Sequence, residues 1–236
     1  MKVIVTIPTY NERENIGELI QGILSLEKGI EVVVADDDSP DGTWKVVKEL
    51  SRTNPAVHLL HRKENRGRGS AGKEAFQYAL AQGADLIIEM DGDLSHNPCF
   101  IPSLIEGVKN FDVVIGSRYA RGGKDRRTSA LRRALSKISN WYARKVLGLP
   151  VMDCNSGYRC FKREVLEAIN PLSLKSTGPS IVHELLYKAY KSGFTVGEIP
   201  IEFEERGKET SKLTFGRLLS GLYMVLKIRI YLRKNS

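Results

Sequence analysis

The stretch DLIIEMDGDLSH, residues 85–96, joins a continuous apolar run to a crowded pair of acids. Unbroken runs of this kind are typical of strands buried on both faces of a parallel sheet. Asp91 and Asp93 follow the run with only Gly92 between them, so their carboxylates repel each other. The segment therefore predicts a buried strand whose end carries a site that needs two carboxylates.

The same pattern recurs along the first half of the chain, where apolar runs alternate with helical patterns. The predicted strands are 2–7, 31–36, 57–61, 85–90 and 112–117, and the predicted helices between them are about 13–27, 42–52, 70–82 and 99–109. This alternation predicts a doubly wound α/β fold with a mainly parallel central sheet flanked by helices. The second half predicts helices at 129–147, 180–192 and 213–234, and strands at 195–199 and 201–203 on either side of Pro200.

The composition limits the class of protein. A chain of 236 residues with 42% hydrophobic and 27% charged residues is an ordinary globular sequence with room for a substantial core. Its net charge of +8 favours an anionic partner, which could be nucleic acid, a phosphate-bearing substrate or an acidic membrane. The three cysteines show no metal-binding spacing, which favours packing roles in a reducing compartment. No stretch approaches the ~20 apolar residues of a membrane span, and the N-terminus is typical of a strand and not of a signal peptide.

Polar clusters follow the predicted strands, at the edge of the sheet where such folds bind ligands. Some have simple structural explanations: Asn11 and Glu14 have the spacing of a helix capping box, and Ser39 suits a helix start. Those explanations leave the adjacent acids Asp36 and Asp37 without a role.

Side-chain alternation in an extended chain places Asp91 and Asp93 on one face, and Ser95, two residues further on, would lie on the same face. Two carboxylates on one face suit a hard cation, and Gly92 lets the backbone approach a ligand. The alternative is a turn, because Asp-Gly is a common turn sequence.

Residues 118–145 are strongly basic, with Asp125 as their single acid. A merely solvated face would carry more interspersed acids. Arg132, Ser136 and Asn140 recur every four residues and so share a helix face, and an arginine beside a hydroxyl suits phosphate binding. The segment has no nucleic-acid recognition motif, and we expect no nucleic-acid partner.

Eight segments in order complete the pattern: IPTYNE, DDDSPDGT, NRGRGSA, MDGDLSH, GSRYARGG, NSGYRCF, GEIPIEF and SKL. Together they resemble the inverting family 2 glycosyltransferases, and within them the dolichol-phosphate mannose synthases, from Lys2 to about Leu213. The resemblance implies a glycosyltransferase A fold and inverting transfer of mannose from GDP-mannose to a polyprenyl (dolichyl) phosphate, whose product serves glycosylation. The alternative is a related enzyme that uses UDP-glucose or another nucleotide sugar, with a lipid-phosphate or saccharide acceptor.

The resemblance also implies residue roles, with Asp91, Asp93 and Arg118 as the catalytic group. The implied nucleoside pocket consists of Pro8, Tyr10, Glu12, Ala35 and Asp37. Asp91, Gly92 and Asp93 would meet the donor phosphates and Mg²⁺ or Mn²⁺, with Ser95 at a third position beside the metal. The implied phosphate ligands are Arg118, Arg206 and Lys212 for the donor, and Arg118, Arg132 and Ser136 for the acceptor. Two departures from the family pattern are Glu209, where glycine is usual, and Asn155, where threonine is common.

These observations divide the chain into a catalytic domain, 1–212, and a basic amphipathic helix, 213–236. The helix has two interpretations that the sequence leaves open, a core helix closing the domain or an interfacial helix. A lipid acceptor implies a peripheral protein at the cytoplasmic face of a membrane, without a transmembrane helix in this chain. A small membrane partner subunit is a further partner that the resemblance allows.

Overall fold

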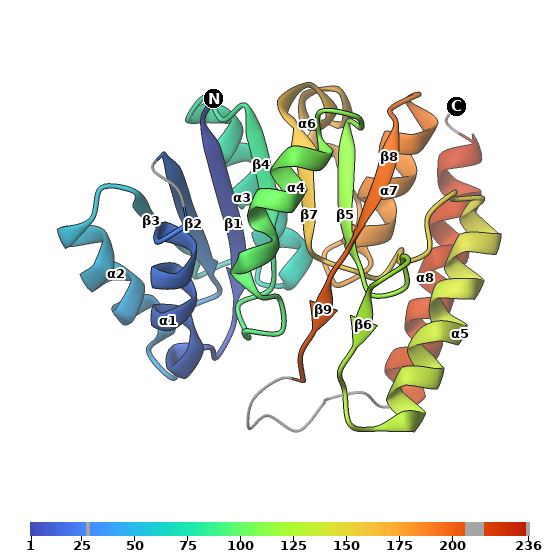
Figure 1. The fold of residues 1–236 in the computed structure, drawn as a ribbon, viewed down its shortest axis with the longest axis horizontal. Helices are drawn as coiled ribbons and strands as arrows, with labels where there is room; N and C mark the ends of the chain where they lie inside the picture. Colours follow the sequence, from blue (N-terminus) through green and yellow to red (C-terminus); the bar gives the residue numbers. More distant parts are fainter. Residues whose placement is uncertain (27–28, 206–214, 235–236) are drawn as a thin grey trace.

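A computed structural model describes residues 1–26, 29–205 and 215–234. Its centre is a seven-stranded sheet in the order β3-β2-β1-β4-β7-β5-β8, and helices lie on both faces (Figure 1). The strands are β1 (Val3–Thr9), β2 (Ile30–Asp36), β3 (Val57–His61), β4 (Leu86–Glu89), β5 (Val113–Ser117), β7 (Arg159–Lys162) and β8 (Val196–Pro200). A separate two-stranded sheet pairs β6 (Lys124–Asp125) with β9 (Glu202–Phe203).

The helices follow the predicted alternation closely in the first half of the chain. They are α1 (Arg13–Leu24), α2 (Thr43–Thr53), α3 (Arg68–Ala81), α4 (Ile101–Gly107), α5 (Ala130–Leu147), α6 (Arg163–Ile169), α7 (Ile181–Lys191) and α8 (Phe215–Lys234). Short 3₁₀ turns cover Pro98–Phe100 and Pro171–Ser173. The five strands predicted for the first half all form, and the α/β class with a mainly parallel sheet is confirmed.

The first four strands are parallel, and β1, β2 and β4 are buried on both faces. Val5 lies between Val32 of β2 and Ile88 of β4 in register, and all three side chains are fully buried. Buried residues of α1, α2 and α4 pack on one face of the sheet, and those of α3, α6 and α7 pack on the other. All the carboxyl ends of these strands therefore meet at one edge.

Strand β7 is the strand of the central sheet that the sequence did not predict; β6 and α6 were not predicted either. It is antiparallel to both β4 and β5 and separates them, so the sheet is mixed and not wholly parallel. Its four residues, RCFK, are too short for a clear periodic signal, and a charged residue begins the strand. Cys160 in this strand is fully buried, which agrees with a packing role.

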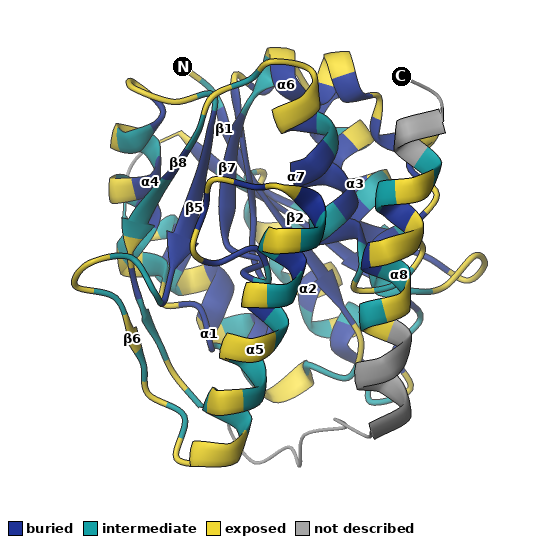
Figure 2. Ribbon diagram, turned by 90° about the vertical axis from the view of Figure 1, so that its right-hand side faces the viewer, coloured by how far each residue is buried: buried dark blue, intermediate teal, exposed yellow. Residues whose placement is uncertain are grey.

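Helix α8 packs against α5 and α7 at the β8 end of the sheet, where Val225 and Ile228 join a buried cluster (Figure 2). The opposite face of α8 exposes Tyr223, Leu226 and Ile230. The helix therefore closes the domain with one face and leaves an apolar face outside. No helix in the described part of the chain is long and apolar enough to cross a membrane, and the domain boundary predicted at residue 213 lies outside the described residues.

Candidate active site

A cleft of about 160 Å³ opens over the carboxyl ends of β1, β2 and β4. Its lining is acidic and brings together segments that are far apart in the sequence. The lining residues are Pro8, Thr9, Tyr10, Glu12, Asp37, Arg68, Ala71, Asp91, Gly92 and Asp93. Seven of these are predicted donor-site residues. Ala35 is an exception, because its side chain is fully buried within β2 among the residues that pack on α3.

The two aspartates of the opening motif lie beyond the strand and not on it. Strand β4 ends at Glu89, and Gly92 to Leu94 form a bend in which Leu94 takes a positive φ of 61°. Strand alternation is therefore not what brings Asp91 and Asp93 together, although both reach the cleft. The same bend carries the two aspartates into the cleft. The interpretation of the segment as a turn is therefore compatible with its interpretation as a cation site.

Ser95 holds Asp93 in place. The Ser95 backbone N–H and hydroxyl donate to Asp93 Oδ1 at 3.1 and 2.5 Å, and Ser95 is fully buried. The family resemblance predicts Ser95 beside a metal, and in this structure the Ser95 hydroxyl contacts the Asp93 carboxylate. Gly92 is confined by β1, because a Cβ there would lie 2.9 Å from Thr9 Cγ2.

The adjacent acids Asp36 and Asp37 have different roles. Asp36 is fully buried and accepts hydrogen bonds from the hydroxyls of Thr9 and Ser39, so it ties the ends of β1 and β2 together. Asp37 faces the cleft, forms an ion pair with buried Arg62 and accepts the Gly67 N–H at 2.6 Å. Burial raises the pKa of Asp37 above its usual value, and these two contacts only partly oppose the shift.

Arg68, at the start of α3, is a site residue that the sequence analysis missed. Its Nη2 lies 2.9 Å from Asp91 Oδ1 and its Nη1 lies 3.2 Å from Glu89 Oε1. Glu89 is almost completely buried, and burial raises its pKa although Arg68 acts in the opposite direction. The predicted helix of 70–82 begins two residues after Arg68 and gave no sign that this side chain would reach across to β4.

His96 supports the backbone of the same bend. Its Nδ1 accepts the Asp91 backbone N–H at 3.2 Å, and its ring stacks on Tyr158 at 5.0 Å between centroids. Burial lowers the pKa of His96, so the ring is neutral and its Nδ1 can accept. This contact fixes where Asp91 begins its turn into the cleft.

Arg118 lies directly after β5 and is held by a buried acid. Its Nε and Nη2 lie 2.7 and 2.8 Å from the two carboxylate oxygens of Asp153, and Asp153 is fully buried. Burial by itself lowers the pKa of the guanidinium, but Asp153 raises it above the ordinary value. The predicted phosphate ligand is therefore a permanently charged group with a fixed orientation.

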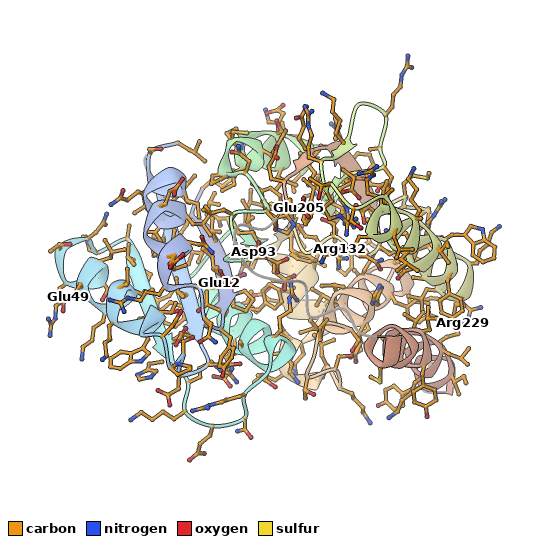
Figure 3. All side chains as sticks on the ribbon, turned by 90° about the horizontal axis from the view of Figure 1, so that it is seen from below. Glu12, Glu49, Asp93, Arg132, Glu205 and Arg229 are labelled. Carbon is orange, nitrogen blue, oxygen red and sulfur yellow. The ribbon has the colours of Figure 1, made fainter. Side chains whose placement is uncertain are left out.

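The other predicted acceptor residues lie on α5. Ser136 Oγ accepts the Tyr119 hydroxyl at 3.0 Å, and Arg132 Nη1 lies 3.7 Å from Glu205 Oε1. Asn140, which shares their helix face, is buried and accepts the Asn155 backbone N–H, so its role is structural. Seen from below, Glu12, Asp93, Arg132 and Glu205 all lie around the middle of the view (Figure 3). Arg206 and Lys212 lie outside the described residues.

The basic segment is less isolated than its sequence indicates. Pairing of β6 with β9 brings Glu202 beside Lys124 and Arg126, with ion pairs of 2.5 and 2.7 Å. The acids that the segment lacks therefore come from residues about eighty positions away, as the 78-residue separation of Lys124 and Glu202 shows. The scarcity of local acids was an incomplete argument for an anionic ligand.

The acidic cleft fits a hard divalent cation in its donor chemistry. Asp91 and Asp93 supply carboxylate oxygens, which Mg²⁺ and Mn²⁺ prefer. Among residues 1–26, 29–205 and 215–234, no group of three His, Cys, Asp or Glu side chains is arranged to hold a metal ion by itself. A cation here would take its remaining ligands from a substrate and water, as Mg²⁺ sites that include substrate phosphates do.

A sheet of this topology, with an acidic cleft at its carboxyl edge and arginines beside it, is typical of the class of doubly wound α/β proteins that bind ligands at that edge. Comparison with known proteins narrows the class. Residues 4–169 match the family model described as glycosyl transferase family 2. The chain belongs to this family and is a glycosyltransferase.

Relatives of known name match the chain over nearly its whole length. It is 37% identical over 226 residues to the polyprenol monophosphomannose synthase of Mycolicibacterium smegmatis, with 95% of this chain and 85% of that protein covered. It is 36% identical to the undecaprenyl-phosphate mannosyltransferase of Micrococcus luteus, covering 92% and 89%. It is 39% identical to the dolichol-phosphate mannosyltransferase of Pyrococcus furiosus, covering 96% of this chain and 64% of that longer protein.

Solved structures confirm the glycosyltransferase A fold. The glucosyl-3-phosphoglycerate synthase of Mycobacterium tuberculosis, in a complex with Mn²⁺, UDP-glucose and phosphoglyceric acid, superposes with a TM-score of 0.69. The match covers 98% of this chain and 79% of that one, at 18% identity. A second complex of that enzyme, with Mn²⁺ and UDP, gives a TM-score of 0.67 at 20% identity, covering 96% and 78%.

Proposed function

We propose that the protein transfers mannose from GDP-mannose to a polyprenyl phosphate, with inversion at the anomeric carbon. The observation that carries the proposal is the match of almost the entire chain to three polyprenyl-phosphate mannosyltransferases. The acidic cleft supports it, because seven of the residues expected to bind the donor line one cavity. The likeness to UDP-glucose complexes concerns the fold alone and does not identify the donor.

In this proposal Asp91 and Asp93 hold Mg²⁺ or Mn²⁺ against the donor diphosphate. The ion would stabilise the negative charge that develops on the leaving nucleoside diphosphate. Ser95 orients Asp93, and the His96 ring fixes the backbone of Asp91, so the two carboxylates are in place before substrate arrives. Glu12 and Asp37, on the walls of the same cleft, would line the nucleoside pocket.

The acceptor phosphate would bind between the cleft and α5, near Arg118, Arg132 and Ser136. A phosphate is already anionic near neutral pH, so the chain needs no strong general base to generate the nucleophile. Arginines there would offset the repulsion between two phosphate-bearing substrates. Arg118 suits this task because Asp153 fixes its guanidinium without filling all of its donors.

The lipid acceptor implies work at a membrane surface, and we propose that the outer face of α8 contacts it at the cytoplasmic side. Tyr223, Leu226 and Ile230 are 65%, 43% and 51% exposed, at the spacing of one helix face, and Lys227 lies beside them. Apolar side chains flanked by a basic one suit an anionic bilayer surface. A small membrane partner subunit would be an alternative occupant of this face.

The transfer assay uses purified full chain, Mn²⁺, a polyprenyl phosphate and radiolabelled sugar nucleotide, followed by organic extraction. Label from GDP-mannose should enter the organic phase and require the metal. Extraction of label from UDP-glucose instead would support the alternative donor. Label that stays in the aqueous phase with both donors would contradict the lipid acceptor, and a parallel reaction with a saccharide in place of the lipid would then test the alternative acceptor.

A further inference from the structure

The guanidinium of Arg68 bridges two acids at the centre of the candidate site. It lies 2.9 Å from Asp91 on the cleft side and 3.2 Å from Glu89 beneath it. The Arg68 side chain is 22% exposed, and that of Asp91 25%, whereas Glu89 is 1% exposed. The guanidinium thus extends from a buried anchor to the wall of the cleft.

The backbone around Arg68 and Asp91 is closely packed at several glycines. A Cβ on Gly157 would lie 2.7 Å from Arg68 Nη2 and 3.4 Å from Asp91 Oδ1, so a side chain there would push the pair apart. A Cβ on Gly69 would lie 2.6 Å from the Thr177 carbonyl carbon, so the backbone next to Arg68 is also closely packed. Gly157 therefore leaves room for the pair of Arg68 and Asp91, whereas Gly67 and Gly69 leave room for the Thr177 backbone beside the start of α3.

The bridge is also held electrostatically from below. Glu89 Oε1 accepts from Arg68, and Glu89 Oε2 is a buried oxygen without a hydrogen-bond partner among the described residues. A buried carboxylate needs a nearby cation to remain ionised. Burial lowers the pKa of Arg68 but the two carboxylates raise it above its ordinary value, so the guanidinium stays charged.

We propose that Arg68 is a built-in cation of the site, which neutralises and positions Asp91 before a divalent ion binds and makes binding of that ion depend on the donor diphosphate. The inference rests on the proposed metal position at Asp91 and Asp93. A fixed positive charge beside Asp91 repels a second cation, and the negative diphosphate offsets that repulsion. Metal and nucleoside diphosphate therefore bind cooperatively, and each increases the affinity of the other by the same factor.

The test measures Mn²⁺ affinity by electron paramagnetic resonance, with and without GDP, so its readout is independent of turnover. Arg68→Met should bind Mn²⁺ without nucleotide about tenfold to a hundredfold more tightly than the wild type, as expected for removing a like charge from a partly buried site. The factor by which GDP increases Mn²⁺ affinity should shrink correspondingly. Arg68→Lys keeps the charge and should remain close to the wild type.

Two further variants keep the test decisive. Arg68→Met leaves buried Glu89 without the cation bonded to it, so Arg68→Met combined with Glu89→Gln removes that carboxylate and should show the same tightening in a stable protein. Arg66→Met is the matched control, because Arg66 carries the same charge two residues earlier but is 48% exposed and pairs with Asp38. It should leave the Mn²⁺ affinity within about twofold, as expected for a screened surface charge.

Suppose the wild type binds Mn²⁺ in the presence of GDP, but both proteins with Arg68→Met bind Mn²⁺ no more tightly than the wild type. That result would overturn the role of Arg68 and leave the proposed function intact. A wild type that binds no Mn²⁺ with GDP or UDP would instead overturn the metal position on which both depend. Equal tightening by Arg66→Met would also reject the inference, because it would show a general charge effect.

Discussion

The acidic cleft and the basic segment, which lie on two sides of the proposed substrate site, differ in how deeply their ion pairs are buried. In the acidic cleft, Asp37 and Arg62 are 7% and 3% exposed and form a buried ion pair. On the basic side, Lys124 and Glu202 are 54% and 34% exposed and form a solvent-accessible ion pair. Buried pairs cost much to break because one partner is left uncompensated, whereas exposed pairs contribute little. The cleft is therefore a rigid, prepaired site, as is the buried pair of Arg118 and Asp153, whereas the β6–β9 part of the basic side is an adaptable surface.

The largest effect that this comparison predicts is on activity at Asp93. Asp93→Asn keeps the shape of the side chain but removes a charge from the cleft. Loss of metal stabilisation worth several kcal/mol should lower sugar transfer at least about 10³-fold. The matched change on the basic side, Glu202→Gln, should lower it less than about threefold, as for a weak surface pair. Initial rates with extracted lipid product measure both, and comparable losses would erase the distinction between the two sides.

The next effect is on stability at Asp153, which is fully buried against Arg118. Asp153→Ala leaves that guanidinium buried and uncompensated, and should lower the free energy of unfolding by about 3 to 5 kcal/mol. Glu202→Ala, which breaks exposed pairs, should lower it by less than about 1 kcal/mol. Urea unfolding followed by circular dichroism gives both values. A loss at Asp153 no greater than that at Glu202 would contradict the division into rigid and adaptable regions.

The third prediction concerns the pH dependence of stability, which tests a buried titratable group, His183 on α7. Its Nε2 lies 2.7 Å from Asn155 Oδ1, and burial lowers its pKa to about 3. The folded state therefore keeps His183 neutral while the unfolded chain binds a proton near its ordinary value of about 6.5. This stability is present above pH 6.5 and is lost as pH falls toward 3.

Between pH 6.5 and 5.0 the expected loss is about 1.5 kcal/mol, before most carboxylates titrate. His183→Gln retains a donor for Asn155 but does not titrate, so its unfolding free energy should fall less over that interval. Denaturant titrations at several pH values measure the difference between the two slopes. Parallel slopes for the wild type and the variant would show that His183 is not the linked group.

The smallest effect concerns the outer surface of α8. Leu226→Glu combined with Ile230→Glu should weaken binding to anionic vesicles about tenfold, through lost apolar contact and added negative charge. Leu172→Glu is a control for a charge placed on another exposed apolar residue, since Leu172 is 58% exposed in a different part of the chain. Flotation on a density gradient measures all three proteins. Equal losses for the control would argue against a specific face.

The sequence alone determined the architecture and most of the cleft because those signals are local. Most strands of the first half are continuous apolar runs followed by a polar loop, so the order along the chain predicts which loops meet at the edge. Pro8, Glu12 and Asp91 lie in one cleft for this reason, although the strand alternation used for Asp91 and Asp93 does not extend beyond Glu89. The resemblance to a family then gave these residues roles that periodicity cannot supply.

Only the tertiary structure decided how the charges are paired. Strand β7 enters between β4 and β5 from a distant part of the chain, and its four residues carry no periodic signal that would place it there. Arg68 reaches Asp91 across 23 positions, Arg118 reaches Asp153 across 35, and Lys124 reaches Glu202 across 78. Such partners are set by the packing of whole elements, and burial then determines which pairs are rigid. The sequence thus predicted where the crowded carboxylates of DGD lie, and the fold supplied the arginine that makes their crowding stable.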